Sequence, residues 1–174
     1  MKHGRAAGIA GAVGAALPDI PSILGTAYYI GPRFLTDGWS SMDSEEVLEA
    51  IYFTGPFGAT GYALHAATGP LVFLTAYALL RLKRRDGSRD GKKIILWFLV
   101  GWLGHTLVDF LTHAEDVRPL FYPLSDWTWA SPISYYDPDY HGRAFALASN
   151  GFATVLLIGL LLKRLLTNEP DEQQ

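Results

Sequence analysis

Four long apolar stretches divide the sequence, and polar or charged residues separate them. They cover residues 6–30, 60–80, 94–113 and 144–162. The last of these, Ala144 to Leu162, contains no charged residue. Its 19 residues would rise about 28 Å as a helix, close to the ~30 Å hydrocarbon core of a bilayer. The pattern predicts an all-α integral membrane bundle of about four transmembrane helices.

The first stretch differs from the others in its glycines, alanines and prolines. Gly and Ala let helices approach closely in lipid, but the run Leu17-Pro18-Asp19-Ile20-Pro21 interrupts the apolar pattern. Because proline removes a backbone donor and clashes with the preceding turn, we expect this span to be broken near Pro18 and Pro21. A signal peptide is an alternative interpretation, since Lys2 and Arg5 precede the short apolar run.

The distribution of basic residues predicts the orientation. The short segment 81–93 holds seven Lys or Arg against two Asp, and such segments stay on the cytoplasmic side of the inner (plasma) membrane. Four spans then place both termini in the cytoplasm and leave residues 31–59 and 114–143 outside. The second outer segment is rich in Tyr and Trp, which favour the lipid headgroup layer.

Composition narrows the class of protein. A chain of 174 residues predicts a single helical membrane domain over residues 1–166, followed by a disordered acidic tail at 167–174. Charged residues make up 18% of the chain, below the roughly 25% of soluble domains, although a soluble bundle of very apolar helices is an alternative. A net charge of −3 argues against nucleic acid as a partner. Without cysteine, only His and carboxylate side chains remain as strong metal ligands.

Ionisable side chains inside the apolar stretches are the candidate functional residues. His105, Asp109 and His113 recur every four residues, so they lie on one face of a helix. In the predicted topology Asp19 and His65 lie at a similar depth, toward the outer side. Because an unpaired carboxylate in lipid costs several kcal/mol, we expect Asp19 and Asp109 to be paired, hydrogen-bonded, protonated or metal-bound. His65 alone is equally consistent with a hydrogen bond between helices, and Asp19 with a helix cap.

These residues also carry a resemblance to a known family. The stretch Leu17-Pro18-Asp19-Ile20, the helix from Gly104 to His113 and the segment Pro119-Leu120-Phe121-Tyr122-Pro123-Leu124-Ser125 are similar to the membrane-bound metal-dependent hydrolase family, also described as LexA-binding, inner-membrane-associated hydrolases. The resemblance implies a divalent-metal site in a helical inner-membrane protein. By motif position, the implied metal ligands are Asp19, His65, His105 and Asp109.

The chain departs from the family pattern at two places. The family often has a second Asp where Pro21 stands, and an additional His where this sequence has Thr60, Gly61 and Tyr62. Fewer ligands make a centre of two metal ions less compatible with this sequence. Residues that would surround the ligands or contact a substrate are His3, His113, Ser125 and His141.

Three functions are consistent with these patterns. The first is a metal-dependent hydrolase acting at the outer membrane interface on a phosphoester or another lipid-associated substrate, with Zn²⁺ as the expected ion and Asp19 or Asp109 as the catalytic carboxylate. The second is a non-enzymatic membrane protein that uses the His/Asp stripe for ion or proton passage or for helix association. The third is a scaffold whose basic segment binds anionic lipid headgroups.

Overall fold

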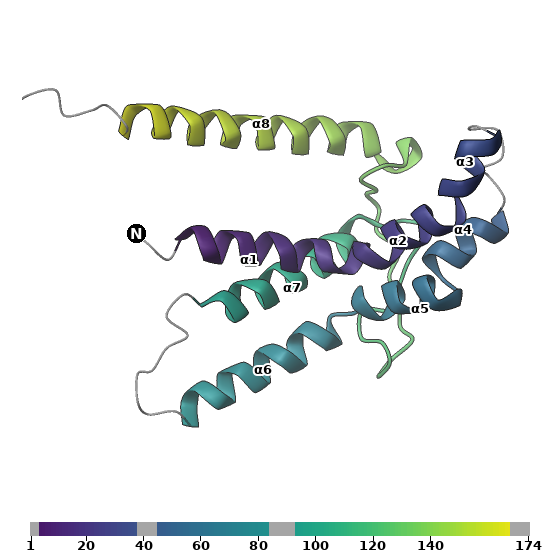
Figure 1. The fold of residues 1–174 in the computed structure, drawn as a ribbon, viewed down its shortest axis with the longest axis horizontal. Coiled ribbons are helices and arrows are strands. Elements are labelled where there is room, and N and C mark those ends of the chain that lie inside the picture. Colours follow the sequence, from purple (N-terminus) through teal and green to yellow (C-terminus); the bar gives the residue numbers. More distant parts are fainter. Residues whose placement is uncertain (1–3, 38–44, 84–92, 168–174) are drawn as a thin grey trace, which may run out of the picture. The chain divides into compact units, whose positions relative to one another are not determined.

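In a computed structural model of the chain, residues 4–37, 45–83 and 93–167 are described (Figure 1). All regular elements among them are helical, which confirms the all-α prediction for this part of the chain. Residues 168–174 of the predicted tail 167–174 lie outside the described residues, as does the candidate residue His3, whereas Thr167 is the last residue of a helix. The α-helices are α1 (Gly4–Ala16), α2 (Ile20–Tyr29), α3 (Gly31–Asp37), α4 (Glu45–Tyr52), α5 (Gly55–Leu64), α6 (Thr68–Lys83), α7 (Ile94–Thr112) and α8 (Gly142–Thr167). Two short 3-10 helices are η1 (Leu17–Asp19) and η3 (Pro138–Tyr140).

The chain forms two compact units. The core unit comprises Met1–Leu111 and Asp116–Trp129, and the C-terminal unit comprises Thr112–Glu115 and Ala130–Gln174. A compact unit is not the same as an independently folding domain, so one domain over residues 1–166 stays a prediction.

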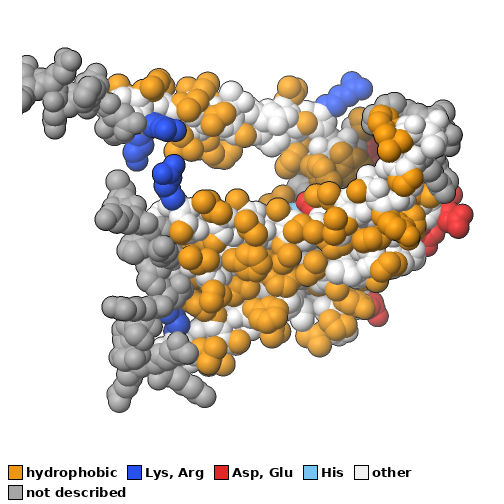
Figure 2. Space-filling view, viewed as in Figure 1, with side chains coloured by type: hydrophobic (Ala, Val, Ile, Leu, Met, Phe, Trp, Pro, Cys, Tyr) orange, Lys and Arg blue, Asp and Glu red, His pale blue; other side chains and the backbone are white. Residues whose placement is uncertain are grey.

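Three helical stretches are long and apolar enough to cross a membrane. They are Gly4–Tyr29, Ile94–Thr112 and Gly142–Leu166. Their side chains are mostly exposed: no residue of the most apolar window of Gly142–Leu166 is buried within the protein. In the core unit, hydrophobic side chains cover the outer faces of α1, α6 and α7 (Figure 2). A surface of this kind is stable in hydrocarbon and not in water, which indicates association with a membrane.

The predicted break in the first stretch is not confirmed. The stretch Gly4–Tyr29 qualifies as one candidate span, interrupted only by the 3-10 turn η1. Pro18 and Pro21 both stand in the first turn of a helix, where the missing N–H would have no intrahelical partner in any case. At these positions each proline lies at the start of a helix, and the candidate span continues through both of them.

A pronounced bend lies instead in the second stretch. α5 ends at Leu64 and α6 begins at Thr68, and the two helices are bent by 50° at the break. If this bent pair counts as one span, the chain has up to four. The apolar pattern of residues 60–80 did not predict this bend.

Glycines bring α1 and α7 into backbone contact. A Cβ on Gly14 of α1 would overlap the Phe98 carbonyl of α7, and a Cβ on Gly101 of α7 would overlap the Gly11 carbonyl of α1. Figure 1 shows the two helices side by side. Only glycine permits this approach, which is the close packing expected of small residues between helices in lipid.

Replacing Gly14 by Ala tests this contact. The added methyl group must push α1 away from α7, so we expect a loss of about 1–3 kcal/mol of stability, seen as a lower thermal unfolding midpoint in detergent. Gly8→Ala in the same helix is the matched control, because a Cβ there meets nothing within 4 Å. Equal midpoints for the two variants would contradict the close packing.

Candidate metal centre

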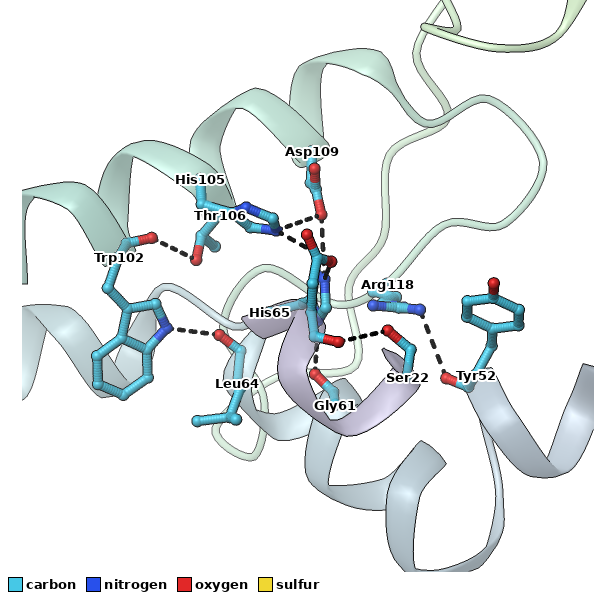
Figure 3. Close-up of polar contacts among 11 residues, drawn as sticks. Ser22, Tyr52, Gly61, Leu64, His65, Trp102, His105, Thr106, Asp109 and Arg118 are labelled. Atoms are coloured by element: carbon cyan, nitrogen blue, oxygen red, sulfur yellow. Dashed lines mark hydrogen bonds and ion pairs between the residues drawn. The ribbon is translucent and has the colours of Figure 1, made fainter. Parts of the chain in front are cut away.

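Four titratable side chains of the core unit converge on one point (Figure 3). Asp19 ends η1, His65 lies at the break after α5, and His105 and Asp109 are one turn apart on α7. His65 Nε2 is 3.5 Å from Asp19 Oδ1 and 3.2 Å from Asp109 Oδ2. His105 Nε2 is 3.7 Å and 3.1 Å from the same two oxygens. The structure thus brings together the residues that the resemblance implies as ligands.

The bend between α5 and α6 is held by polar contacts that satisfy its backbone. Trp102 Nε1 on α7 donates to the Leu64 carbonyl at 2.7 Å, as Figure 3 shows. The backbone N–H of Ala67 donates to the Leu120 carbonyl, also at 2.7 Å. Irregular backbone at membrane depth is tolerated where protein groups complete its hydrogen bonds, so the bend can hold His65 at a fixed place.

The His65 ring is oriented by its own helix. His65 Nδ1 lies 2.6 Å from the Gly61 carbonyl, and because a carbonyl only accepts, Nδ1 must carry the proton. The other nitrogen, Nε2, then faces the two carboxylates. Metal-binding histidines commonly donate one ring N–H to a backbone carbonyl in this way, which leaves the second nitrogen as ligand.

The His105 ring lies beside the same two carboxylates but makes no hydrogen bond with them. Its Nε2 is buried and makes no hydrogen bond, although carboxylate oxygens of Asp109 and Asp19 lie 3.1 and 3.7 Å away. A buried polar atom without a hydrogen bond is costly, and an ion between the nitrogen and the carboxylates would satisfy it.

The separations between these atoms are compatible with an ion held between them. A charged imidazole donating to a carboxylate would be about 2.7–2.9 Å from it. Ligand atoms held tetrahedrally at about 2.1 Å from one ion are roughly 3.4 Å from each other. The four nitrogen–oxygen distances run from 3.1 to 3.7 Å, which leaves room for an ion between the imidazoles and a carboxylate. Asp19, His65 and His105 form a group that could hold a metal ion, and Asp109 adjoins it.

Three of the four side chains are largely buried, and the fourth is half exposed. The side chains of His65, His105 and Asp109 are 6%, 15% and 21% exposed, whereas that of Asp19 is 51% exposed. Asp19 is therefore the most exposed of the four side chains.

The remaining candidate residues have contacts within their own segments. His113 belongs to the C-terminal unit, where its ring packs edge-on against Tyr135 and Tyr136. His141 of the same unit adopts a left-handed backbone conformation after η3. Ser125 accepts a hydrogen bond from the backbone N–H of Trp127. A role for these three around the metal ligands stays a prediction.

Two residues near the centre escaped the sequence reasoning. Trp102 could have been found from the sequence, because an indole N–H inside an apolar helix needs a hydrogen-bond acceptor. Arg118 is a single basic residue in a polar loop, and nothing in the sequence distinguishes it from a surface charge.

Comparison of the chain with protein-family models, curated proteins and solved structures gives no match. The resemblance to the metal-dependent hydrolases therefore stays a prediction.

Asp109→Asn tests the metal centre directly. Losing one carboxylate ligand and its charge should weaken zinc binding by at least about 100-fold, more than the loss of an outer contact usually costs. Equilibrium dialysis of the detergent-purified protein with elemental analysis measures this. Asp139→Asn is the control, because Asp139 is exposed in η3. Equal zinc affinity of the two variants would rule out Asp109 as a ligand.

Trp102→Phe tests the support of the bend. The ring stays but the donor to the Leu64 carbonyl is lost, so His65 should lose part of its orientation and zinc affinity should fall by about 10-fold. Trp97→Phe on the same helix is the control, since the Trp97 side chain is 46% exposed. An unchanged zinc affinity in Trp102→Phe would show that the bend does not depend on this bond.

Proposed function

We propose that the chain is a membrane-embedded metal-dependent hydrolase that acts at the outer membrane interface on a phosphoester or lipid-associated substrate. The observation that carries this proposal is the group of Asp19, His65 and His105, whose ligand atoms lie within 4.8 Å of one another, with the Asp109 carboxylate beside both imidazoles. The resemblance of the Gly104–His113 helix to metal-dependent hydrolases points to the same class.

Zn²⁺ is the ion we propose, because its catalytic sites use three His or carboxylate ligands and keep the fourth position for water, so that one of the two carboxylates remains to act on that water. A bound divalent ion supplies an acidified water and polarises the substrate oxygen. Residues of the protein orient the ligands and exclude water. Gly61 fixes the His65 ring, and the enclosed His105 and Asp109 side chains keep bulk water from the inner side.

Asp19 is the residue to which we assign proton transfer. Its side chain is the most exposed of the four and lies where water would enter. A carboxylate in that position can orient the attacking water or accept its proton. The Ser22 hydroxyl donates a hydrogen bond to the backbone carbonyl of Asp19 at 2.9 Å. This bond stabilises the turn that carries the Asp19 side chain.

The proposed orientation places the basic ends of the core helices in the cytoplasm. Arg5 stands in the first turn of α1, Arg81 in the last turn of α6, and Lys93 directly before α7. These helix ends lie together at one end of the core unit in Figure 1, and α4 lies at the opposite end. Four spans, with the bent α5–α6 pair as one, then put both termini inside and the opening at Asp19 toward the outer side.

A rival function uses the same four side chains without a metal. If His65 is doubly protonated, its Nε2–H faces two carboxylates and would form part of a proton path or a lock between helices. The two functions separate in proteoliposomes. Proton flux that needs no metal and disappears in Asp109→Asn would support the rival and contradict the hydrolase.

The hydrolase proposal predicts that activity depends on metal and on His65. A chelator should abolish hydrolysis of a phosphoester panel, and zinc should restore it. His65→Ala should lower kcat by about 1000-fold or more, because both water activation and charge stabilisation depend on the ion. Asp139→Asn should match the wild type. Chelator-resistant activity, or full activity in His65→Ala, would contradict the proposal.

A further inference from the structure

The segment that follows α7 in the core unit exposes large apolar and aromatic side chains. It runs over residues 116–129 and belongs to the same compact unit as the candidate metal centre. We call its exposed hydrophobic residues the aromatic surface: Phe121, Tyr122, Leu124, Trp127 and Trp129. The Leu124 side chain is 80% exposed, and that of Trp127 is 53% exposed. Contiguous apolar side chains of this size are unfavourable in water, which indicates that the aromatic surface has a partner.

Hydrogen bonds fold this segment into a defined turn. The backbone N–H of Leu124 donates to the Phe121 carbonyl at 2.8 Å, and that of Ser125 donates to the same carbonyl at 3.1 Å. The backbone N–H of Trp127 donates to the Ser125 hydroxyl oxygen at 3.2 Å. The hydrophobic side chains are therefore exposed by an ordered turn.

The aromatic surface continues the exposed apolar side of α7. The rings of Trp127 and Trp129 pack against Phe110 of α7, with ring centroids 5.8 and 5.2 Å apart. Leu107 and Leu111 of the same helix are exposed. Because α7 is a candidate span that ends at Thr112, the two indoles lie near the end of that span. This is the level at which the hydrocarbon core meets the lipid headgroups.

The two tryptophans indicate which partner covers the surface. Neither indole N–H makes a hydrogen bond among the described residues. Water would satisfy these donors but leave the rings exposed, and hydrocarbon would cover the rings but leave the donors without an acceptor. The headgroup layer does both, because its phosphate and ester oxygens lie directly beside the acyl chains.

The same segment is bonded to the part of the chain that carries His65. The backbone N–H of Ala67, in the break after α5, donates to the Leu120 carbonyl at 2.7 Å. The Tyr122 ring packs edge-on against Tyr62, one turn before His65, with ring centroids 5.2 Å apart. The aromatic surface is therefore attached to the segment that supplies a candidate metal ligand.

We propose that the aromatic surface docks the core unit into the headgroup layer of a phospholipid bilayer, beside the metal centre. Its apolar side chains enter the upper acyl chains, and the indole N–H groups of Trp127 and Trp129 donate to lipid oxygens. Docking of this kind needs no metal. The inference therefore goes beyond the proposed hydrolase function and holds or fails without it.

The absence of cysteine from the chain permits a direct test with one nitroxide label. The labelled full-length Leu124→Cys variant is placed in vesicles of phosphatidylcholine and phosphatidylglycerol. Electron paramagnetic resonance then compares the contact of the label with oxygen, which concentrates in hydrocarbon, and with a water-soluble nickel chelate. Labelled Glu46→Cys in the first turn of α4 is the water control, and labelled Val100→Cys in α7 is the hydrocarbon control, because both side chains are exposed.

We expect the ratio of oxygen contact to nickel contact at position 124 to lie several-fold above that of Glu46→Cys and below that of Val100→Cys. A ratio equal to that of Glu46→Cys would overturn the proposal, because the aromatic surface would then face water. A ratio equal to that of Val100→Cys would also contradict it, since the surface would then lie in hydrocarbon below the headgroups. Low contact with both reagents would overturn it as well, because protein and not lipid would then cover the surface. None of these results depends on bound zinc, so failure of this proposal leaves the hydrolase proposal to its own tests.

Discussion

The cost of leaving an imidazole or a carboxylate without a partner in lipid governs the rest of this structure. Four such groups come from three segments of the chain, and each alone would cost several kcal/mol in hydrocarbon. They meet at distances of 3.1–3.7 Å, so each satisfies another or shares an ion with it. Around that point lie the bend after α5 and the backbone contact between α1 and α7.

Three local features bring the four groups together. Gly14 and Gly101 let α1 and α7 touch, so that Asp19 reaches the face of α7 that carries His105. The bend after α5 turns His65 inward, and Trp102 satisfies the carbonyl that the bend exposes. The same α7 therefore supplies two candidate ligands and the support for a third. The centre therefore depends on α7, although α7 is apolar in composition.

The sequence predicted the candidate ligands better than it predicted the backbone that holds them. His105 and Asp109 follow from a spacing of four, which fixes a shared helix face whatever surrounds it. Asp19 and His65 follow from depth in the membrane, which a hydropathy pattern also gives. The bend at His65 did not follow, because the Trp102 donor that stabilises it comes from a distant part of the chain. The predicted break near Pro18 and Pro21 is not confirmed, because the effect of a proline depends on whether it stands at a helix start, which the apolar pattern alone does not show.

X-ray absorption spectroscopy at the zinc edge of the zinc-loaded protein tests the central claim most directly, because it reports the ligands of the bound ion themselves. We expect a first shell of four light atoms at about 2.0–2.1 Å, with the outer-shell scattering of two imidazole rings. Removing either His65 or His105 should delete one ring from that scattering. A shell of six oxygens without imidazole scattering would contradict the account, since the ion would then bind elsewhere and the four side chains would not form a metal centre.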